Sequence, residues 1–173
     1  DAIMAVYPFT PQPVIADAII SVADVPVFVG VGGGVTSGMR SYRLAIQAEH
    51  QGAFGVVLNA PIPNDVVRLI KEDVDIPVVV TVVSETTDIQ ARLDAGADIL
   101  NVSGAARTPE IVAHIRKRFP EVPIIATGGP TDESILATIR AGANAITYTP
   151  PTSAALFARS MERYREAEAP AED

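Results

Sequence analysis

The chain has 173 residues, 48% of them hydrophobic and 20% charged, which is the composition of one folded domain with a single core. Its formal net charge is −8, so we expect no nucleic-acid partner and no membrane partner, because phosphates and anionic lipids repel an acidic protein. The absence of cysteine excludes disulfides, thiolate metal ligands and a cysteine nucleophile. No apolar stretch approaches the roughly 20 residues of a membrane span and no signal peptide is recognisable, so the sequence predicts a cytoplasmic protein.

Seven short runs rich in Val and Ile alternate along the chain with patterns typical of helices. Nearly continuous hydrophobicity is typical of parallel strands that are covered on both faces. The predicted strands are Ile3–Tyr7, Val27–Val31, Gly55–Asn59, Val78–Val83, Ile99–Ser103, Ile124–Thr127 and Ala145–Thr149. The predicted helices are Val14–Val22, Ser37–Gln51, Asp65–Glu72, Thr87–Asp94, Pro109–Phe119, Asp132–Ala141 and Ala154–Ala167.

Several helix ends carry local signals. Three glycines stand where a helix is expected to end and a left-handed residue is needed; they are Gly52, Gly96 and Gly142. Thr87 and Gln90 resemble a capping box at the start of the fourth helix. Thr108 is the expected N-cap of the fifth helix, since Pro109 suits the first helical position.

The starts of the predicted strands alternate between a proline type and a Gly-Ala type. The proline type occurs at Pro26, Pro77 and Pro123, and the Gly-Ala type at 52–53, 96–97 and 142–143. This two-unit repeat favours a closed barrel over a doubly wound sheet. We therefore predict a single-domain (β/α)₈ TIM barrel over residues 1–173, with seven βα units present.

The N-terminal residues bear on how that barrel closes. Residues 1–4 resemble a Gly-Ala-type strand start, so the alternation makes Ile3–Tyr7 the second strand and predicts that the first βα unit is missing. A gap in the barrel leaves unpaired strand edges, which attract other strands. Three outcomes are open: upstream residues were removed, a partner chain fills the gap, or the sheet stays open. We favour removal followed by association through the open edge, and therefore expect a homo-oligomer.

Small, uncharged polar residues recur at the ends of the predicted strands, where the functional residues of such barrels lie. They are Asn59, Thr81, Asn101, Ser103, Thr127 and Thr149. We interpret this set as a hydrogen-bonding pocket for a small molecule. The alternative is that each residue satisfies a neighbouring backbone group or an internal water.

The loop after the predicted strand Val27–Val31 is a candidate for contact with an anion or substrate. Gly32, Gly33 and Gly34 let the backbone approach a ligand and expose amides, and Arg40 lies near the start of the next helix. The alternatives are a purely conformational turn for the glycines and a solvated helix face for Arg40.

A second glycine loop follows the predicted strand Ile124–Thr127. Gly128 and Gly129 precede a helix at the position where barrels of this kind bind phosphate, with Ser153 of the following loop nearby. Pro150 and Pro151 remove two amide donors from that following loop. The alternative is a tight turn before a helix.

Charged residues at the strand ends are few. Glu85 comes directly after a strand and is the candidate general acid or base, with Asn59 and Asn101 expected to orient or polarise a substrate carbonyl. Arg107 precedes a helix and is a candidate to hold an anionic group. Two histidines and two lysines fall on predicted helices: His50, His114, Lys71 and Lys117. We therefore predict no metal site, no Schiff-base lysine and no cofactor.

Two resemblances to known families accompany these residues. The segment IIATGGPTDESILATIRAGANA, from Ile124 to Ala145, resembles the phosphate-binding class of TIM barrels, which includes keto-deoxy-phosphogluconate aldolase, thiamine phosphate synthase and the inosine monophosphate dehydrogenase barrel. The aldolase lysine and the dehydrogenase cysteine have no counterpart in this chain. The segments VGGGVTSGMRS, VVVTVVSETTDI, NVSGAARTPEIV and ATGGPTDESI are similar to an uncharacterised bacterial family of small barrels. That family is loosely labelled as hydrolases, so this resemblance implies a hydrolase.

The sequence thus predicts an enzyme that acts on a small phosphorylated or carboxylated metabolite. Lyase, isomerase and hydrolase chemistry all stay open, because no nucleophile–base pair is visible. The alternative is a non-catalytic ligand-binding or scaffold barrel, which the shortage of charges at the strand ends favours.

Overall fold

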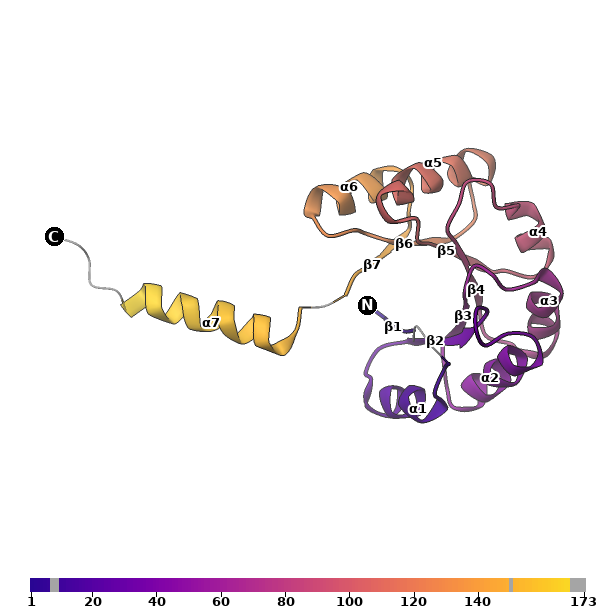
Figure 1. Cartoon of the computed structure of the whole chain (residues 1–173), viewed down its shortest axis with the longest axis horizontal. Coiled ribbons are helices and arrows are strands. Elements are labelled where there is room, and N and C mark those ends of the chain that lie inside the picture. Colours follow the sequence, from indigo (N-terminus) through magenta and orange to yellow (C-terminus); the bar gives the residue numbers. More distant parts are fainter. Residues whose placement is uncertain (7–9, 150, 169–173) are drawn as a thin grey trace.

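Seven parallel strands curve into an almost closed barrel whose outer side is covered by helices (Figure 1). The structure, a computed structural model, describes residues 1–6, 10–149 and 151–168. The strands are β1 (Ile3–Ala5), β2 (Val27–Gly32), β3 (Gly55–Leu58), β4 (Val78–Val82), β5 (Ile99–Val102), β6 (Ile124–Thr127) and β7 (Ala145–Thr147). The helices are α1 (Pro13–Val22), α2 (Met39–His50), α3 (Asn64–Asp73), α4 (Ile89–Asp94), α5 (Thr108–Arg118), α6 (Asp132–Arg140) and α7 (Ser153–Glu168), and a 3₁₀ turn, η1 (Ala105–Arg107), precedes α5.

The order of the strands in the sheet follows the chain from β1 to β7, and every neighbouring pair is parallel. This confirms the predicted barrel architecture. Within the described residues no ladder joins β7 to β1, so both strands keep a free edge. The expected gap is therefore present, whereas the missing βα unit, inferred from the alternation of strand starts, stays a prediction.

Alternation along the strands gives the sheet two different faces. The outward-facing residues, such as Val80, Leu100 and Val102, are fully buried in a core shared with α3 and α5. A smaller cluster fills the inside of the barrel and contains Phe28 and Val79. Because side chains alternate between the faces, every second residue further along each strand also points inward.

Several predicted element ends differ from the structure. Strand β1 ends at Ala5, while Tyr7, like Pro150, lies outside the described residues. Strand β7 ends at Thr147, which leaves Thr149 beyond the sheet. Left-handed glycines do end the helices before β3, β5 and β7, with φ angles of 91°, 101° and 109° at Gly52, Gly96 and Gly142.

Both predicted N-caps were wrong. Helix α4 is capped by Asp88, whose carboxylate accepts a hydrogen bond from the backbone N of Ala91 at 3.0 Å. This aspartate replaces the predicted pair Thr87 and Gln90, because a carboxylate is a strong acceptor for the positive end of a helix. Thr108 is the first residue of α5 instead of its cap, and its hydroxyl bonds within the preceding loop.

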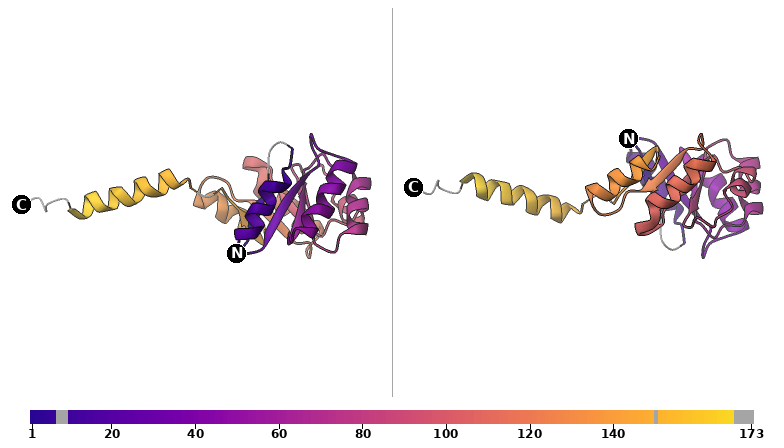
Figure 2. Two further views of the ribbon diagram at one scale, coloured as in Figure 1. Left: turned by 90° about the horizontal axis from the view of Figure 1, so that it is seen from below. Right: turned by 90° about the horizontal axis from the view of Figure 1, so that it is seen from above.

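Helix α7 does not cover the barrel. Helices α2, α5 and α6 each pack on the strand before them and the strand after them, but no described strand follows β7. Figures 1 and 2 show α7 extending away from the barrel. Three large side chains of this helix are exposed: Phe157, Met161 and Tyr164. Within the described ranges, no helix combines the length and the apolar character that crossing a bilayer requires.

Candidate functional site

Two pairs of polar side chains lie on the inner face of the barrel, at the C-terminal ends of β4, β5 and β6. Thr81 and Asn101 are register partners, and the Nδ2 of Asn101 donates a hydrogen bond of 3.1 Å to the Oγ1 of Thr81. One layer further on, the Oγ1 of Thr127 donates to the Oγ of Ser103 at 3.3 Å. These four residues, called the inner ring below, join three strands that the sequence places 20 or more residues apart.

The other two members of the predicted polar set lie at the same end of the sheet but outside the inner ring. Asn59 follows β3 and is exposed, and its backbone N donates to the carbonyl of Gly32 at 2.8 Å. Thr149 lies two residues beyond β7 and is exposed. Thr147, which the sequence analysis did not single out, is the inward-facing register partner of Thr127.

Asn101 is the most unusual member of the inner ring. Its side chain is 9% exposed, and its Oδ1 has no hydrogen-bond partner among the residues that the structure describes. Leaving a buried acceptor unsatisfied costs about 1–3 kcal/mol, and native proteins keep few such groups. The amide nitrogen is directed at Thr81, so the oxygen is the atom left without a described partner.

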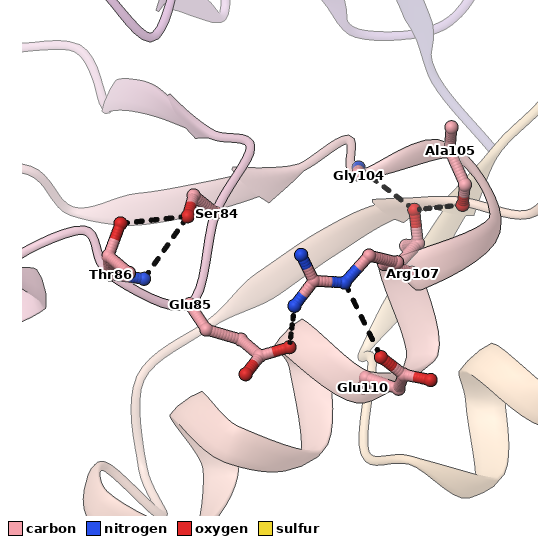
Figure 3. Close-up of polar contacts among 8 residues, drawn as sticks. Ser84, Glu85, Thr86, Gly104, Ala105, Arg107 and Glu110 are labelled. Atoms are coloured by element: carbon pink, nitrogen blue, oxygen red, sulfur yellow. Dashed lines mark hydrogen bonds and ion pairs between the residues drawn. The ribbon is translucent and has the colours of Figure 1, made fainter.

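The charged candidates form a cluster between the loops that follow β4 and β5 (Figure 3). A guanidinium nitrogen of Arg107 lies 2.6 Å from the Oε1 of Glu85, and its Nε lies 3.5 Å from the Oε2 of Glu110. The hydrogen bond and charge of Glu85, followed by those of Glu110, raise the pKa of Arg107 above its ordinary value. Glu85 and Arg107, two separate candidates in the sequence, are therefore one ion pair that links the loops after β4 and β5.

This pairing bears on the expected role of Arg107. Its side chain is exposed, and two carboxylates already neutralise its charge, so the cluster as a whole is acidic. An acidic cluster repels a second anion. The role of Arg107 in holding an anionic group stays a prediction. Glu85 lies three residues beyond β4 and is half-buried.

Local hydrogen bonds build the two loops that carry this cluster. The Oγ of Ser84 lies 2.9 Å from the Oγ1 of Thr86 and accepts from the Thr86 backbone N at 3.2 Å (Figure 3). The Oγ1 of Thr108 accepts from the backbone N of Gly104 and donates to the carbonyl of Ala105. Each loop is therefore shaped mainly by its own residues, and the ion pair fixes one against the other.

The glycine loop after β2 is occupied by contacts within the protein. Gly33 has a φ of 111°, and its backbone N donates to the carbonyl of Thr36 at 2.6 Å. A Cβ at Gly33 would lie 2.9 Å from the backbone N of Asn59, so packing alone requires glycine there. Gly34 is exposed, and Arg40 is exposed on the first turn of α2.

The glycine loop after β6 is likewise engaged in the fold. The backbone N of Gly128 donates to the carbonyl of Thr147 at 3.0 Å, and a Cβ there would lie 2.6 Å from the Cγ2 of Ile146. Gly129 has a φ of 81° and is exposed. Ser153 is the first residue of α7, which leads away from the barrel, and its place in a phosphate site stays a prediction.

The amino end of α6 already has oxygen partners. Thr131 and Ser134 form a capping box that the sequence analysis missed, because serine takes the place of the usual Glu or Gln. The pKa of Glu133 is lowered by its own backbone N–H and by the Thr131 side chain. The backbone N of Ser134 at this helix end donates to the Thr131 hydroxyl, and phosphate binding here stays a prediction.

Arg92 is a positioning residue that the sequence analysis did not identify. From α4 its guanidinium donates to the carbonyls of Ala60 and Ile62 and to the Oδ1 of Asn64 at 2.6 Å. Partial burial lowers its pKa from the ordinary value. Arg92 thereby holds the loop after β3, which carries Asn59. Across the part of the chain that the structure describes, no group of three or more His, Cys, Asp or Glu side chains is placed to hold a metal ion.

Solved structures share this fold. No protein-family model matches the chain, and no curated protein matches its sequence. Dihydrodipicolinate synthase from Aquifex aeolicus is 18% identical, with a TM-score of 0.65 over 86% of this chain and 58% of that one. A 2,3-dimethylmalate lyase of the PEP mutase/isocitrate lyase superfamily is 17% identical, with a TM-score of 0.65 over 93% of this chain and 68% of that one. Phosphoenolpyruvate phosphomutase from Streptomyces platensis subsp. rosaceus is 15% identical, with a TM-score of 0.62 over 88% of this chain and 64% of that one.

At these identities the likeness shows a shared TIM-barrel fold. The chain spans from 58% to 68% of the length of these three proteins. Their names describe a synthase, a lyase and a mutase, so they give no support to the hydrolase label that the sequence resemblance implied.

Proposed function

We propose that this chain is a small-metabolite enzyme of the TIM-barrel type, whose substrate binds over the inner ring. The observation that carries the proposal is the buried Oδ1 of Asn101 at the C-terminal end of the strands, to which no residue of the described ranges donates. Active sites of TIM barrels lie at that end. A ligand that donates a hydrogen bond to Oδ1 would remove the cost of leaving this atom unsatisfied.

Within this proposal the residues have distinct roles. Thr81, Asn101, Ser103 and Thr127 bind the oxygen atoms of the substrate, and the half-buried Glu85 moves a proton at the rim. Arg107 positions Glu85 through the 2.6 Å contact and takes no part in holding an anion. The substrate class that we propose is a carboxylated metabolite, since one glycine amide in each predicted phosphate loop, that of Gly33 and that of Gly128, donates within the fold.

The names of the structural neighbours favour lyase or isomerase chemistry for this site over hydrolysis. A non-catalytic ligand-binding barrel is the second candidate. The neutralised Arg107 favours it, because the cluster at the rim then serves to lock two loops together.

We also propose that a further parallel βα unit, or a second copy of the chain, occupies the gap between β1 and β7. Both edge strands keep free backbone groups on the side of the gap, and such edges favour pairing. A strand in that gap would provide α7 with the second strand on which the other helices pack.

A binding experiment tests the location of the site. The wild type is melted with a panel of small carboxylic acids, and a ligand that binds the native state raises Tm. Asn101→Leu should abolish this rise while leaving the stability of the free protein unchanged or higher, because it removes a buried unsatisfied atom.

Val102→Ala is the matched control. Val102 is next to Asn101 but faces the outer core, so this variant should lose roughly 1–3 kcal/mol of stability and still show the ligand-induced rise in Tm. A rise of equal size in wild type and Asn101→Leu would refute the site.

A further inference from the structure

We infer that the substrate presents a hydroxyl group flanked by acceptor oxygens, as in a 2-hydroxycarboxylate. The inference deepens the proposed function and rests on it. It follows from the direction of each hydrogen bond in the inner ring, which determines the atoms that remain available to a ligand.

The first available group is the hydroxyl of Thr81. Its Oγ1 accepts the hydrogen bond from the Nδ2 of Asn101 at 3.1 Å. A threonine hydroxyl that accepts one bond still carries its own hydrogen, which it can donate. Thr81 is half-buried, so a ligand that enters from the C-terminal end of the barrel can reach it.

The second available group is the Oδ1 of Asn101. This oxygen is buried, it can only accept, and no described residue donates to it. The other members of the inner ring are the hydroxyl residues Thr81, Ser103 and Thr127, so the ring itself holds no ammonium or guanidinium group that competes for this oxygen.

The third available group is the hydroxyl of Ser103. Its Oγ accepts from the Oγ1 of Thr127 at 3.3 Å and so retains its own hydrogen for donation. Ser103 lies two residues after Asn101 in the same strand direction, so the two side chains point to the same face of the sheet.

Together these groups form a donor, a buried acceptor and a donor. The complementary ligand has an acceptor, a donor and an acceptor, which is the pattern of a hydroxyl beside carboxylate oxygens. A ligand made only of acceptors would place its lone pairs against those of Oδ1 and leave that atom unsatisfied. Sites built around a hydroxyl reject analogues that lack it for this reason.

The test uses three acids with the same three-carbon skeleton and carboxylate. Lactate has a hydroxyl donor at C2, propionate has no polar group there, and pyruvate has an acceptor. Each is titrated into the ¹⁵N-labelled protein, and the side-chain amide signal of Asn101 reports binding at the ring. We expect lactate to bind at least about tenfold more tightly than propionate or pyruvate.

Variants link this preference to the ring. Asn101→Leu lacks this amide signal, so its binding is followed by Tm, and none of the three acids should raise it. Val102→Ala should keep the preference for lactate in the amide titration, because residue 102 faces the outer core. The free amino acid alanine serves as a fourth ligand, since it carries a charged ammonium donor at C2 in place of the hydroxyl of lactate.

The outcomes separate this inference from the proposed function. Equal binding of the three acids at the ring, or tighter binding of pyruvate or alanine than of lactate, overturns the hydroxyl inference and leaves the site in place. If no acid shifts the Asn101 signal while the carboxylate panel gives an Asn101-dependent rise in Tm, the inference alone fails. If no acid shifts the Asn101 signal and no carboxylic acid of the panel raises Tm, both the proposed site and the hydroxyl inference are refuted.

Discussion

The carboxylate of Glu85 and the guanidinium of Arg107 meet at 2.6 Å, although 22 residues separate them in the chain. The contact joins the loops that follow β4 and β5, directly above the two strands that contribute Thr81 and Asn101 to the inner ring. It therefore fixes the position of the one carboxylate that the proposed mechanism uses.

We predict that Glu85→Gln lowers the activity by about 10²-fold or more, which is the scale of losing a general acid or base. Stability should change by less than about 1 kcal/mol, because a partly exposed ion pair contributes little. Initial rates and thermal melts measure the two effects. Glu110→Gln is the control, since Glu110 also contacts Arg107 but lies on α5, and unchanged activity in both variants would remove Glu85 from the mechanism.

The glycine loop after β2 allows a comparison of packing with backbone strain. Gly33→Ala should destabilise the protein by roughly 2–4 kcal/mol, because the new Cβ lies 2.9 Å from a backbone atom and φ is 111°. Gly38→Ala should cost only about 1–2 kcal/mol, because its φ is 59° and no atom lies within 4 Å of the new Cβ. Urea titration measures the free energy of unfolding of both variants. Equal decreases would show that the contact with Asn59 does not add to the cost at Gly33.

Arg116 is predicted to stabilise the carboxyl end of α5. Its guanidinium donates to the carbonyls of Val122 and Gly142 and to the Oδ1 of Asn144 at 2.8–3.1 Å. It also donates to the carbonyls of Phe119 and Pro120. Arg116→Lys keeps the charge but loses the planar fork, so it should cost roughly 1.5–3 kcal/mol. Arg118→Lys, on the exposed side of the same helix, should be close to neutral in the same denaturation experiment.

Helix α7 is predicted to promote self-association. Phe157, Met161 and Tyr164 follow one another at the spacing of one helix face and are 72%, 48% and 69% exposed. Sedimentation velocity should therefore show a mass that rises with concentration, and Phe157→Ser combined with Met161→Ser should reduce it. Arg159→Ser, on another side of α7, is the control. A single-chain mass at every concentration would contradict the prediction.

Local patterns in the sequence were sufficient to predict the architecture. Val-rich runs separated by amphipathic segments indicated parallel strands buried on both faces, and glycines 52, 96 and 142 indicated the helix ends, because these features depend only on neighbouring residues. Alternation also placed Thr81, Asn101, Ser103 and Thr127 at one end of the sheet. Their roles in a reaction stay predictions.

Only the tertiary structure determined which of these residues meet. The hydrogen bond between Thr81 and Asn101 depends on the register of β4 and β5, and the ion pair of Glu85 and Arg107 depends on the path of two loops. Arg92 and Arg116 reach acceptors up to 32 residues away, which no local pattern records. The sequence therefore determined what kind of side chain stands at each strand end, whereas chain packing decided which donors are satisfied within the fold and left Oδ1 of Asn101 without a described partner.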